Sequence, residues 1–519
     1  MATRKGGLGS LEQYRKYLTD KNVVIFLFIF ALVLRIMFAN GGIPHFDSIA
    51  DANKAPLVLE TGKMQYSYGY GSPGIVVLTT VVYALDHWTT GATNAEFAYF
   101  FITFITAALS ISVLYLIVRK ITKDQLTGFL AAIFFCVTPI YLSVTTYPKT
   151  HAPGVFFALL GGYYLLKAAD GDKKELRCII YSGLLFSFAT TIRVFSFIYI
   201  IPFLLIYARP KISLGKKTSL SFNKAILDKK NMFWFIFSLF IVFFILFIPR
   251  FMEMGIGGFI KIILGEKGTV SVSRGFFESA KFSLSQLGIS ITWLGWIAIA
   301  LGAYYLYKKS KLAFSSIALW FLIFFVFFSR MVSMEARFLI PALIPLIIFM
   351  ACGTKLLYNS NKILGIAVAV VLVVWMFATI YPIIDYRHDH SGQKEFALWI
   401  AENTEPNALI MTNDEGFFME FYTDRKRLTP PRPWEGQTVE GFMEQLHDYS
   451  DNGIPLYITS TGFAIDPGKQ FSTALTNEFD LFLVGERENE HYSQNTLQFQ
   501  KFNEQLVKVV PKTIANEAE

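Results

Sequence analysis

A loop between the first two apolar runs of this chain carries carboxylates beside a membrane. The loop reads HFDSIADANKAPLVLETGKMQYSYGYGS. It follows Arg35, near the end of the first apolar run, and stops before Pro73, at the start of the second. A carboxylate can remove a proton from a hydroxyl group that attacks an electrophile. The placement of the loop therefore indicates chemistry at the surface of a bilayer.

The composition shows that most of the chain is suited to a membrane. Of 519 residues, 53% are hydrophobic and 52 are phenylalanine, well above the share in a water-soluble domain. The start is polar and basic, and no small-residue cleavage site follows 22–39, so this run is expected to stay as the first anchor. We predict an all-α polytopic membrane domain over 1–384 and an extracytoplasmic, soluble α/β domain over 385–519.

The net charge of +8 hides a segregation of charge along the chain. Residues 385–519 contain 11 Lys and Arg against 23 Asp and Glu, which leaves 36 against 16 for residues 1–384. The positive excess therefore belongs to membrane loops, and we predict no nucleic-acid partner. The three cysteines all lie in apolar runs, which argues against disulfides and thiolate metal sites.

Apolar runs and basic loops together predict the topology. A spanning helix needs about 20 apolar residues, and short basic loops mark the cytoplasmic side. We expect the basic clusters to lie inside; they are at 4–21, 119–123, 167–177, 209–230, 308–311 and 355–362. The apolar runs are 22–39, 74–88, 97–118, 126–144, 152–168, 178–208, 231–249, 286–307, 312–330, 337–357 and 363–384.

If every basic cluster lies inside, two of the apolar runs cannot each cross the membrane once. Run 74–88 is short and preceded by glycines and a proline, so we predict a re-entrant or surface-lying segment. Run 178–208 must cross twice, as a tight hairpin that turns near Arg193. The result is eleven crossings of the plasma (inner) membrane, with a cytoplasmic N-terminus and the C-terminal domain outside.

The last 135 residues alternate helix-like and strand-like stretches. KEFALWIAENTEPNA has helical spacing, and GFFMEFYTDR fits a helix that ends in a turn. ALIMTN, PLYITST and FDLFLVGE have the character of strands. No Gly-rich phosphate loop, zinc-ligand spacing or internal repeat occurs here. We therefore expect a small α/β domain with a sheet.

Several motifs, in order along the chain, resemble the GT-C superfamily of integral-membrane glycosyltransferases. Within it, the branch of protein mannosyltransferases and lipid A aminoarabinose transferases is the most similar. The motifs are the Arg35-ended helix with HFDSIADA, YSYGYGSPG, VTTYPKTHAPGVFFALLGGYYLLKA, TTIRVFSFIYIIP, ARFLIPALIPLIIF and WIAENTEPNALIMTNDEGFFMEFYTDRK. The resemblance implies a GT-C-like fold and an envelope enzyme that transfers a hexosyl or pentosyl unit from a polyprenyl-phosphate sugar to a hydroxyl acceptor on lipid, glycan or protein.

The resemblance also implies which carboxylate is catalytic. The family's catalytic acid lies in the first outer loop, and Asp47 is the residue that matches it. Asp47 would be the general base that takes the proton of the acceptor hydroxyl. Family members often have an acid directly after this position, where this chain has Ser48, and another where it has Lys149, Thr150 and His151. These departures leave open which sugar is moved and whether a divalent metal takes part.

Cations are needed on the departing phosphate, because they neutralise charge that grows as the glycosidic bond breaks. The outer-face candidates for binding the donor phosphate are Lys149, Arg337, His151, Lys63 and Arg274. Candidates for holding the acceptor or supporting the base are Asp51, Tyr66, Tyr70 and Glu60. A single base without a second, nucleophilic carboxylate implies inversion at the anomeric carbon.

The carboxylates of the loop also have structural interpretations. Asp47 could be the N-cap of a helix over SIADANKA, since Asp is favoured at caps. Asp51, one turn later, could be a solvated helix partner. Glu60 and Lys63 could form a surface ion pair that contributes little stability. The tyrosines of the loop could form an interfacial belt instead of stacking on sugar.

The cations have structural interpretations as well. Lys149 could extend to lipid headgroups, and Arg337 could anchor its apolar helix at the interface. His151 could be a hydrogen-bonding surface histidine. Arg193 is expected either to be buried and paired within the membrane or to sit at the turn of the hairpin.

Two other classes of function compete with the enzyme. A transporter or flippase could move a lipid-linked saccharide without reacting with it, but such proteins place polar groups at mid-membrane and show paired halves. A scaffold could use the tail to bind an envelope partner, in which case the Asp47 loop would be dispensable. Transfer from a labelled polyprenyl-phosphate sugar separates the three.

Overall fold

The structure is a computed structural model that describes residues 19–66, 71–91, 94–170, 175–208, 211–213, 219–221, 228–263, 275–330, 335–413, 416–431, 437–464, 466–492 and 499–512. The chain forms two compact units. The first comprises the N-terminal helix up to Ala39 together with Ala55–Asp385, and the second comprises Asn40–Lys54 and the chain from Tyr386 onward.

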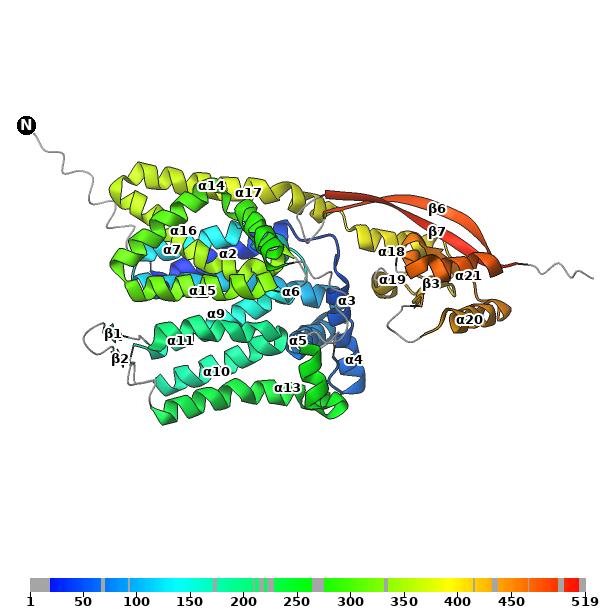
Figure 1. Cartoon of the computed structure of the whole chain (residues 1–519), viewed down its shortest axis with the longest axis horizontal. Coiled ribbons are helices and arrows are strands. Elements are labelled where there is room, and N and C mark those ends of the chain that lie inside the picture. Colours follow the sequence, from blue (N-terminus) through cyan, green and yellow to red (C-terminus); the bar gives the residue numbers. More distant parts are fainter. Residues whose placement is uncertain are drawn as a thin grey trace, which may run out of the picture. The chain divides into compact units, whose positions relative to one another are not determined.

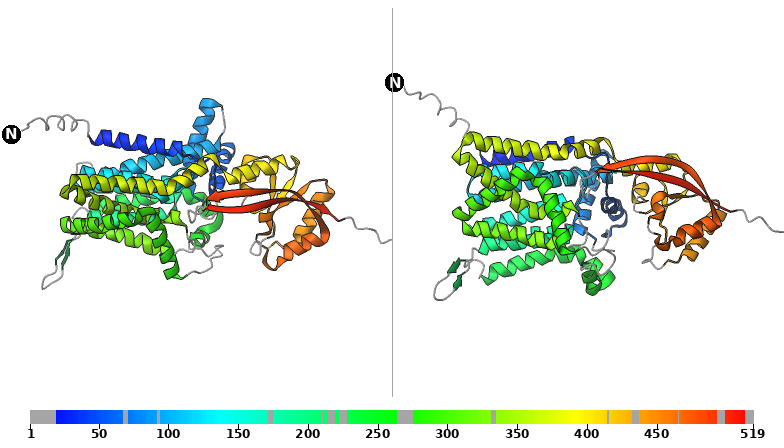
Figure 2. Two further views of the ribbon diagram at one scale, coloured as in Figure 1. Left: turned by 90° about the horizontal axis from the view of Figure 1, so that it is seen from above. Right: turned by 45° about the horizontal axis from the view of Figure 1, so that its top comes forward.

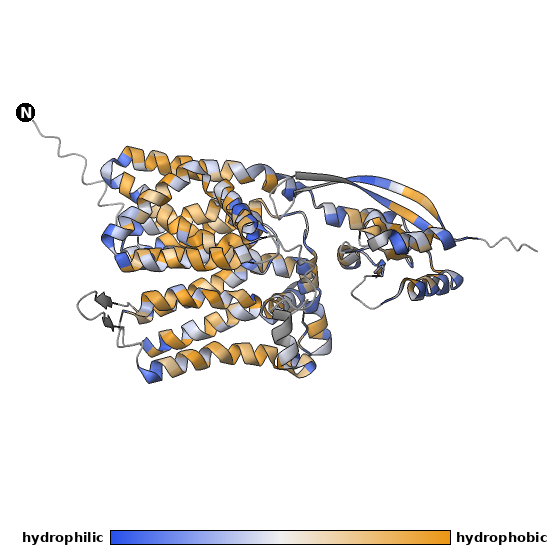
Figure 3. Ribbon diagram, viewed as in Figure 1, coloured by the Kyte–Doolittle hydropathy of each residue, from blue (hydrophilic) through white to orange (hydrophobic). Residues whose placement is uncertain are grey.

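The first unit is a bundle of long apolar helices (Figure 1). Apolar residues run along the helices, whereas hydrophilic residues collect near the helix ends (Figure 3). A short antiparallel hairpin joins β1 (Lys211–Ser213) to β2 (Ser219–Ser221). The helices are α2 (Asp20–Met37), α4 (Lys54–Thr61), α5 (Pro73–Thr90), α6 (Ala95–Thr122), α7 (Gln125–Val137), α8 (Pro139–Thr145), α9 (His151–Ala168), α10 (Glu175–Ile192), η1 (Val194–Tyr199), α11 (Ile200–Ala208), α13 (Lys229–Ile263), α14 (Phe276–Lys309), α15 (Lys311–Arg330), η2 (Ala336–Leu339), α16 (Ile340–Ser360) and α17 (Lys362–Asp389).

Among the described residues, seven helices are long and apolar enough to cross a membrane, or eight if α7 and α8, bent by 61°, form one broken span. The multi-span helical fold is as predicted, but this number is below the eleven predicted crossings. Runs 22–39 and 152–168 are helical as expected, yet α2 carries three charged residues and α9 contains His151, Lys167 and two tyrosines. Val194–Ala208 is apolar but too short to count.

The helix over the second apolar run lies differently from its neighbours. α5 is not one of the seven candidate spans. In Figure 1 and in the left panel of Figure 2, α5 runs across the long helices of the bundle instead of along them. This direction supports the prediction that 74–88 does not cross the bilayer.

The predicted break near Arg193 is confirmed. α10 ends at Ile192, and Arg193 has extended backbone angles of φ −142° and ψ 113°. The 3-10 turn η1 and the helix α11 then follow, and α11 packs against α9 and α15. The break places Arg193 at the end of α10, where its backbone N–H still donates to Ala189 O at 2.9 Å and its carbonyl accepts from the Ser196 N–H at 2.8 Å.

A fully buried arginine joins α2 to the break between α7 and α8. The Arg35 guanidinium is 0% exposed and donates to Thr145 Oγ1 at 3.2 Å, Cys136 O at 3.2 Å, Cys136 Sγ at 3.0 Å and Ala31 O at 3.2 Å. The carbonyls at the end of a helix lack intrahelical donors, and Arg35 supplies one to Cys136. A charge in this position is tolerated because its donors are satisfied.

We expect Arg35→Lys to destabilise the protein. An ammonium has three donors on a point charge and cannot reproduce the spread of a guanidinium over these four acceptors. Each lost hydrogen bond to a charged group costs about 1.5–3 kcal/mol, so the loss is expected to be about 2–4 kcal/mol. The thermal unfolding midpoint in detergent measures it, with Arg177→Lys on the exposed face of α10 as the control. Equal midpoints for both variants would contradict this role.

The second unit contains the α/β domain predicted for the tail. Its sheet has the order β4-β3-β5-β7-β6, in which β3 is parallel to β4 and β5, while β7 is antiparallel to β5 and β6. ALIMTN, PLYITST and FDLFLVGE form strands as predicted, whereas β4 and β7 were not predicted. The elements are α3 (Phe46–Ala52), α18 (Gly392–Glu402), β3 (Leu409–Met411), α19 (Gly416–Tyr422), β4 (Lys426–Leu428), α20 (Val439–Asp451), β5 (Leu456–Thr459), η3 (Ser460–Phe463), η4 (Pro467–Lys469), α21 (Gln470–Glu478), β6 (Phe479–Tyr492) and β7 (Phe499–Pro511).

The segment Asn40–Lys54, from the first predicted outer loop, packs with this tail. The Ile43 backbone N–H donates to the Tyr422 hydroxyl at 2.8 Å, and the Phe46 ring stacks near Phe417 with centroids 6.4 Å apart. The division at residue 384 therefore stays a prediction, with one segment of the first 384 residues belonging to the second compact unit.

Candidate functional site

Asp47 lies within the short helix α3, close to its start. The N-cap of α3 is His45, whose Nδ1 accepts from the Asp47 backbone N–H at 3.2 Å. The interpretation of Asp47 as the cap is therefore wrong. Asp47 Oδ2 also lies 3.4 Å from this ring nitrogen. The Asp47 side chain is 41% exposed, so a substrate can reach its carboxylate.

The other candidates of the first outer loop have different surroundings. Asp51 is 4% exposed, so it is not a solvated helix partner. Glu60 and Lys63 are both exposed, and within the described residues no ion pair joins them. Tyr66 donates its hydroxyl to Leu246 O at 2.7 Å, and burial raises the pKa of its phenol. Tyr66 therefore fastens the loop to α13. Tyr70 and Arg274 lie outside the described residues.

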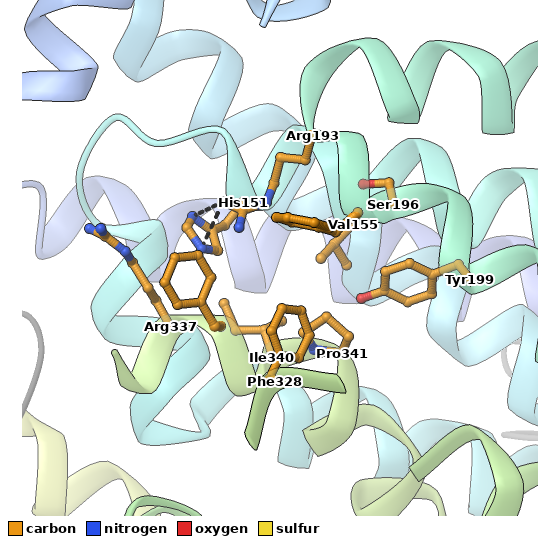
Figure 4. Close-up of a pocket in the computed structure, with 11 residues that line it drawn as sticks. His151, Val155, Arg193, Ser196, Tyr199, Phe328, Arg337, Ile340 and Pro341 are labelled. Atoms are coloured by element: carbon orange, nitrogen blue, oxygen red, sulfur yellow. Dashed lines mark hydrogen bonds between the residues drawn. The ribbon is translucent and has the colours of Figure 1, made fainter. Parts of the chain in front are cut away.

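Three cationic or titratable side chains meet in a pocket of the helical unit. His151 opens α9, Arg193 stands at the hairpin break, and Arg337 belongs to η2. In the view of Figure 4, His151 lies between the two arginines, and Tyr199 lies on the side of the pocket opposite the Arg337 guanidinium. The pocket is lined by His151, Val155, Arg193, Phe195, Ser196, Tyr199, Phe328, Arg337, Phe338, Ile340 and Pro341.

Arg193 is held against the start of α9. Its Nη1 lies 2.9 Å from Nδ1 and 2.8 Å from Nε2 of His151, and it donates to Thr150 Oγ1 at 3.3 Å. A guanidinium only donates, so the ring nitrogen that accepts must be unprotonated and His151 must be neutral. A side chain at Gly154 would come within 3.2 Å of Arg193 Cδ, so this glycine makes room for the arginine.

Arg337 is buried with one carboxylate partner. Its Nε pairs with Glu335 Oε2, and the side chain is 4% exposed. Its Nη1 has no hydrogen-bond partner in the part of the chain that the structure describes. The Phe338 ring lies between the two guanidiniums, with Arg193 Cζ at 5.5 Å and Arg337 Cζ at 5.6 Å from its centroid.

The pocket carries a net positive charge and buried groups that can accept a ligand. Two guanidiniums face one carboxylate and a neutral imidazole. The Tyr199 hydroxyl, on a residue 2% exposed, also has no hydrogen-bond partner within the described ranges. A buried donor left unsatisfied costs about 1–3 kcal/mol, which a bound oxygen would recover. The cavity measures about 20 Å³, which holds about one water-sized oxygen.

The structure therefore brings together some of the predicted cations and not others. His151 and Arg337 share the pocket with Arg193. Lys149, next to His151 in sequence, is buried at 4% exposure but does not line the pocket, and its backbone N–H donates to Thr103 Oγ1 at 3.3 Å. Its interpretation as a headgroup-seeking surface lysine is wrong.

Sequence reasoning missed two polar residues of the pocket, although a signal for them was present. Ser196 and Tyr199 follow Arg193 by three and six residues in a stretch that begins with a break. The 3-10 helix has about three residues per turn, so residues at this spacing eclipse one another. Within the described ranges, no group of three or more His, Cys, Asp or Glu side chains could hold a metal ion.

Comparisons with known proteins agree with this architecture. Residues 81–252 match the family model of dolichyl-phosphate-mannose-protein mannosyltransferase. No curated protein matches the sequence. ArnT from Cupriavidus metallidurans bound to undecaprenyl phosphate is similar in structure, with a TM-score of 0.65 and 12% identity over 93% of this chain and 97% of that one.

Two further solved structures share the fold. The oligosaccharyltransferase AglB from Archaeoglobus fulgidus, in complex with an inhibitory peptide and a dolichol-phosphate, has a TM-score of 0.57 at 12% identity over 94% of this chain and 74% of that one. Arabinofuranosyltransferase AftD from Mycobacteria has a TM-score of 0.54 at 12% identity over 94% and 40%. These matches confirm the predicted resemblance and the predicted fold class.

Proposed function

We propose that this chain, which has the fold of the GT-C integral-membrane glycosyltransferases, transfers a sugar from a polyprenyl-phosphate donor to a hydroxyl acceptor at the outer face of the plasma (inner) membrane. The observation that carries the proposal is the buried cationic pocket of His151, Arg193 and Arg337. The match of residues 81–252 to a family that uses a lipid-phosphate sugar supports the same donor class.

The pocket is suited to the leaving phosphate of such a donor. Negative charge grows on the phosphate oxygens as the bond to the anomeric carbon lengthens, and fixed guanidinium donors stabilise that charge. The space of about 20 Å³ accommodates one oxygen, so the pocket would bind a single phosphate oxygen. The rest of the phosphate would lie outside the cavity.

Asp47 is the proposed base. The acceptor oxygen attacks the anomeric carbon, its proton passes to the Asp47 carboxylate, and the electron pair of the breaking bond leaves with the polyprenyl phosphate. Asp47 takes the proton, and the cations of the pocket stabilise the leaving phosphate. Because a single displacement occurs, the product has the opposite anomeric configuration to the donor.

The test is transfer by the purified protein in proteoliposomes. A panel of hexosyl and pentosyl polyprenyl phosphates is combined with an envelope extract from cells lacking the gene, which supplies the unknown acceptor. We expect one donor to release free polyprenyl phosphate, detected by mass spectrometry. A donor that crosses the bilayer intact would instead identify a flippase, and an inert protein would point to a scaffold.

We expect Tyr199→Phe to separate binding from stability. The variant keeps the ring that packs 4.8 Å from Phe324, between centroids, and removes only a hydroxyl that is buried without a described partner. The thermal midpoint should stay equal or rise, while donor affinity should fall about tenfold, as for the loss of one hydrogen bond to a charged group. Unchanged donor affinity would remove Tyr199 from the proposed site.

A further inference from the structure

The helix that carries Asp47 is too short to hold itself in place. α3 has seven residues, and isolated helices shorter than about 12 residues are marginal in water. Residues 48–52 of α3 are all buried, and α3 packs against α19 of the tail. The direction of the Asp47 side chain therefore depends on what α3 and the chain before it contact.

A tyrosine of α19 fixes the chain four residues before Asp47. The Ile43 backbone N–H donates to the Tyr422 hydroxyl at 2.8 Å, and Ile43 is 0% exposed. Lys394 Nζ lies 5.0 Å from the centroid of the Tyr422 ring and donates to Gly41 O at 3.4 Å. A buried N–H that loses its acceptor costs about 1–3 kcal/mol, so the bond to Tyr422 holds this stretch of chain at a defined position.

An aromatic contact fixes the start of α3 itself. The Phe46 ring stacks on the His45 ring, with centroids 4.8 Å apart, and lies 6.4 Å from the Phe417 ring of α19. The Arg427 Cζ atom lies over the Phe417 ring, 3.8 Å from its centroid, which is within cation–π distance. α19 therefore contacts the chain at two points just before Asp47.

We propose that Tyr422 and Phe417 are positioning residues for sugar transfer, through which the tail holds the Asp47 carboxylate where it meets the acceptor hydroxyl. This inference rests on the proposed function of Asp47 as the base. A misplacement of about 1 Å can cost about 10²-fold in rate, so a residue that touches no substrate can still lower the rate. The donor-phosphate pocket belongs to the first compact unit, so donor binding should not change.

The test is Tyr422→Phe in the full chain, measured as single-turnover transfer from the polyprenyl-phosphate sugar that is active in the transfer assay. The rate is expressed per bound donor, so misfolded protein does not lower it. We expect this rate to fall about tenfold with donor affinity unchanged. Tyr449→Phe is the matched control, because the Tyr449 hydroxyl also accepts a hydrogen bond within the second unit, from Gln445 Nε2 at 2.9 Å. The control should keep the wild-type rate.

The double variant Asp47→Asn, Tyr422→Phe separates positioning from a general structural effect. If Tyr422 acts through Asp47, adding Tyr422→Phe should change the residual rate of Asp47→Asn by less than about twofold, whereas independent effects multiply. A second tenfold loss in the double variant would overturn the proposal. A wild-type rate for Tyr422→Phe alone would overturn it as well.

Hydrogen–deuterium exchange over residues 43–52 gives a measurement that does not need transfer. Tyr422→Phe and Phe417→Leu are expected to speed exchange of these amides about tenfold relative to the rest of the tail, and Tyr449→Phe is not. Unchanged exchange in an active enzyme would refute the hold of α19 on the segment alone. An inert wild type would refute the proposed function, and the exchange rates would still decide whether α19 orders the segment.

Discussion

Asp47→Asn is expected to lower the rate of sugar transfer by about 10³-fold while leaving donor binding within about twofold of wild type. The amide cannot take a proton, and general base catalysis contributes about 10²–10⁴-fold in enzymes that use it. The substitution removes only a charge from a side chain that is 41% exposed, so the fold should be retained. Single-turnover transfer and donor binding are measured separately on purified protein.

The matched control for this prediction is Asp451→Asn. Asp451 is also an exposed aspartate in the second compact unit, at the end of α20. The Asp451→Asn variant should transfer sugar at the wild-type rate. If Asp47→Asn retained more than about a tenth of wild-type turnover, Asp47 would not be the base.

The second large effect is expected at Arg337. Arg337→Gln should reduce kcat/KM for the donor by about 10²–10³-fold, comparable to the loss of one preorganised donor to a developing anion. Arg337→Lys should recover part of this loss, because it restores the charge without the planar fork. Steady-state kinetics over a range of donor concentrations provides the measurement.

The controls must separate loss of a donor from loss of structure, because Arg337 is buried and pairs with Glu335. Arg337→Gln leaves that carboxylate unpaired, so the double variant with Glu335→Gln tests whether neutralising it restores stability. Only stability should recover. Arg177→Gln, on the exposed face of α10, is the activity control. Recovery of transfer in the double variant would reduce Arg337 to a structural role.

Much of the helical unit could be predicted from the sequence because each long helix is specified locally. Apolar runs of about 20 residues, basic ends and a turn near Arg193 are all read from neighbouring residues. The number of crossings was harder to predict from the sequence. α2 and α9 contain charged and polar residues, so their length and composition do not decide whether each one spans the membrane.

In the tail, local signals identified only part of the sheet. β3, β5 and the start of β6 are apolar and were predicted, whereas β4 has three residues and β7 mixes charged with apolar positions. β7 is defined by pairing with β5 and β6, for example Tyr457 opposite Lys508. Such non-local pairing depends on the assembled sheet, which β-propensity alone does not describe.

The candidate pocket also depends on contacts between segments that are far apart in the sequence. His151 and Arg337 could be proposed from their positions at helix ends, but their meeting with Arg193 depends on how α9, the hairpin and η2 pack. Lys149 was an equally reasonable candidate by sequence, and packing directs it elsewhere. The bond from Ile43 to Tyr422 joins residues 379 positions apart, so the packing of the Asp47 segment on the tail could not be read from either segment alone.

The most direct test of sugar transfer uses a donor that carries ¹⁸O in the oxygen bridging the anomeric carbon and the phosphorus. After incubation with the protein and acceptor, mass spectrometry locates the label. The proposed displacement at carbon predicts that all the ¹⁸O stays with the released polyprenyl phosphate and none enters the glycosylated product. Label found in the product, or donor recovered intact on the opposite side of the bilayer, would contradict it.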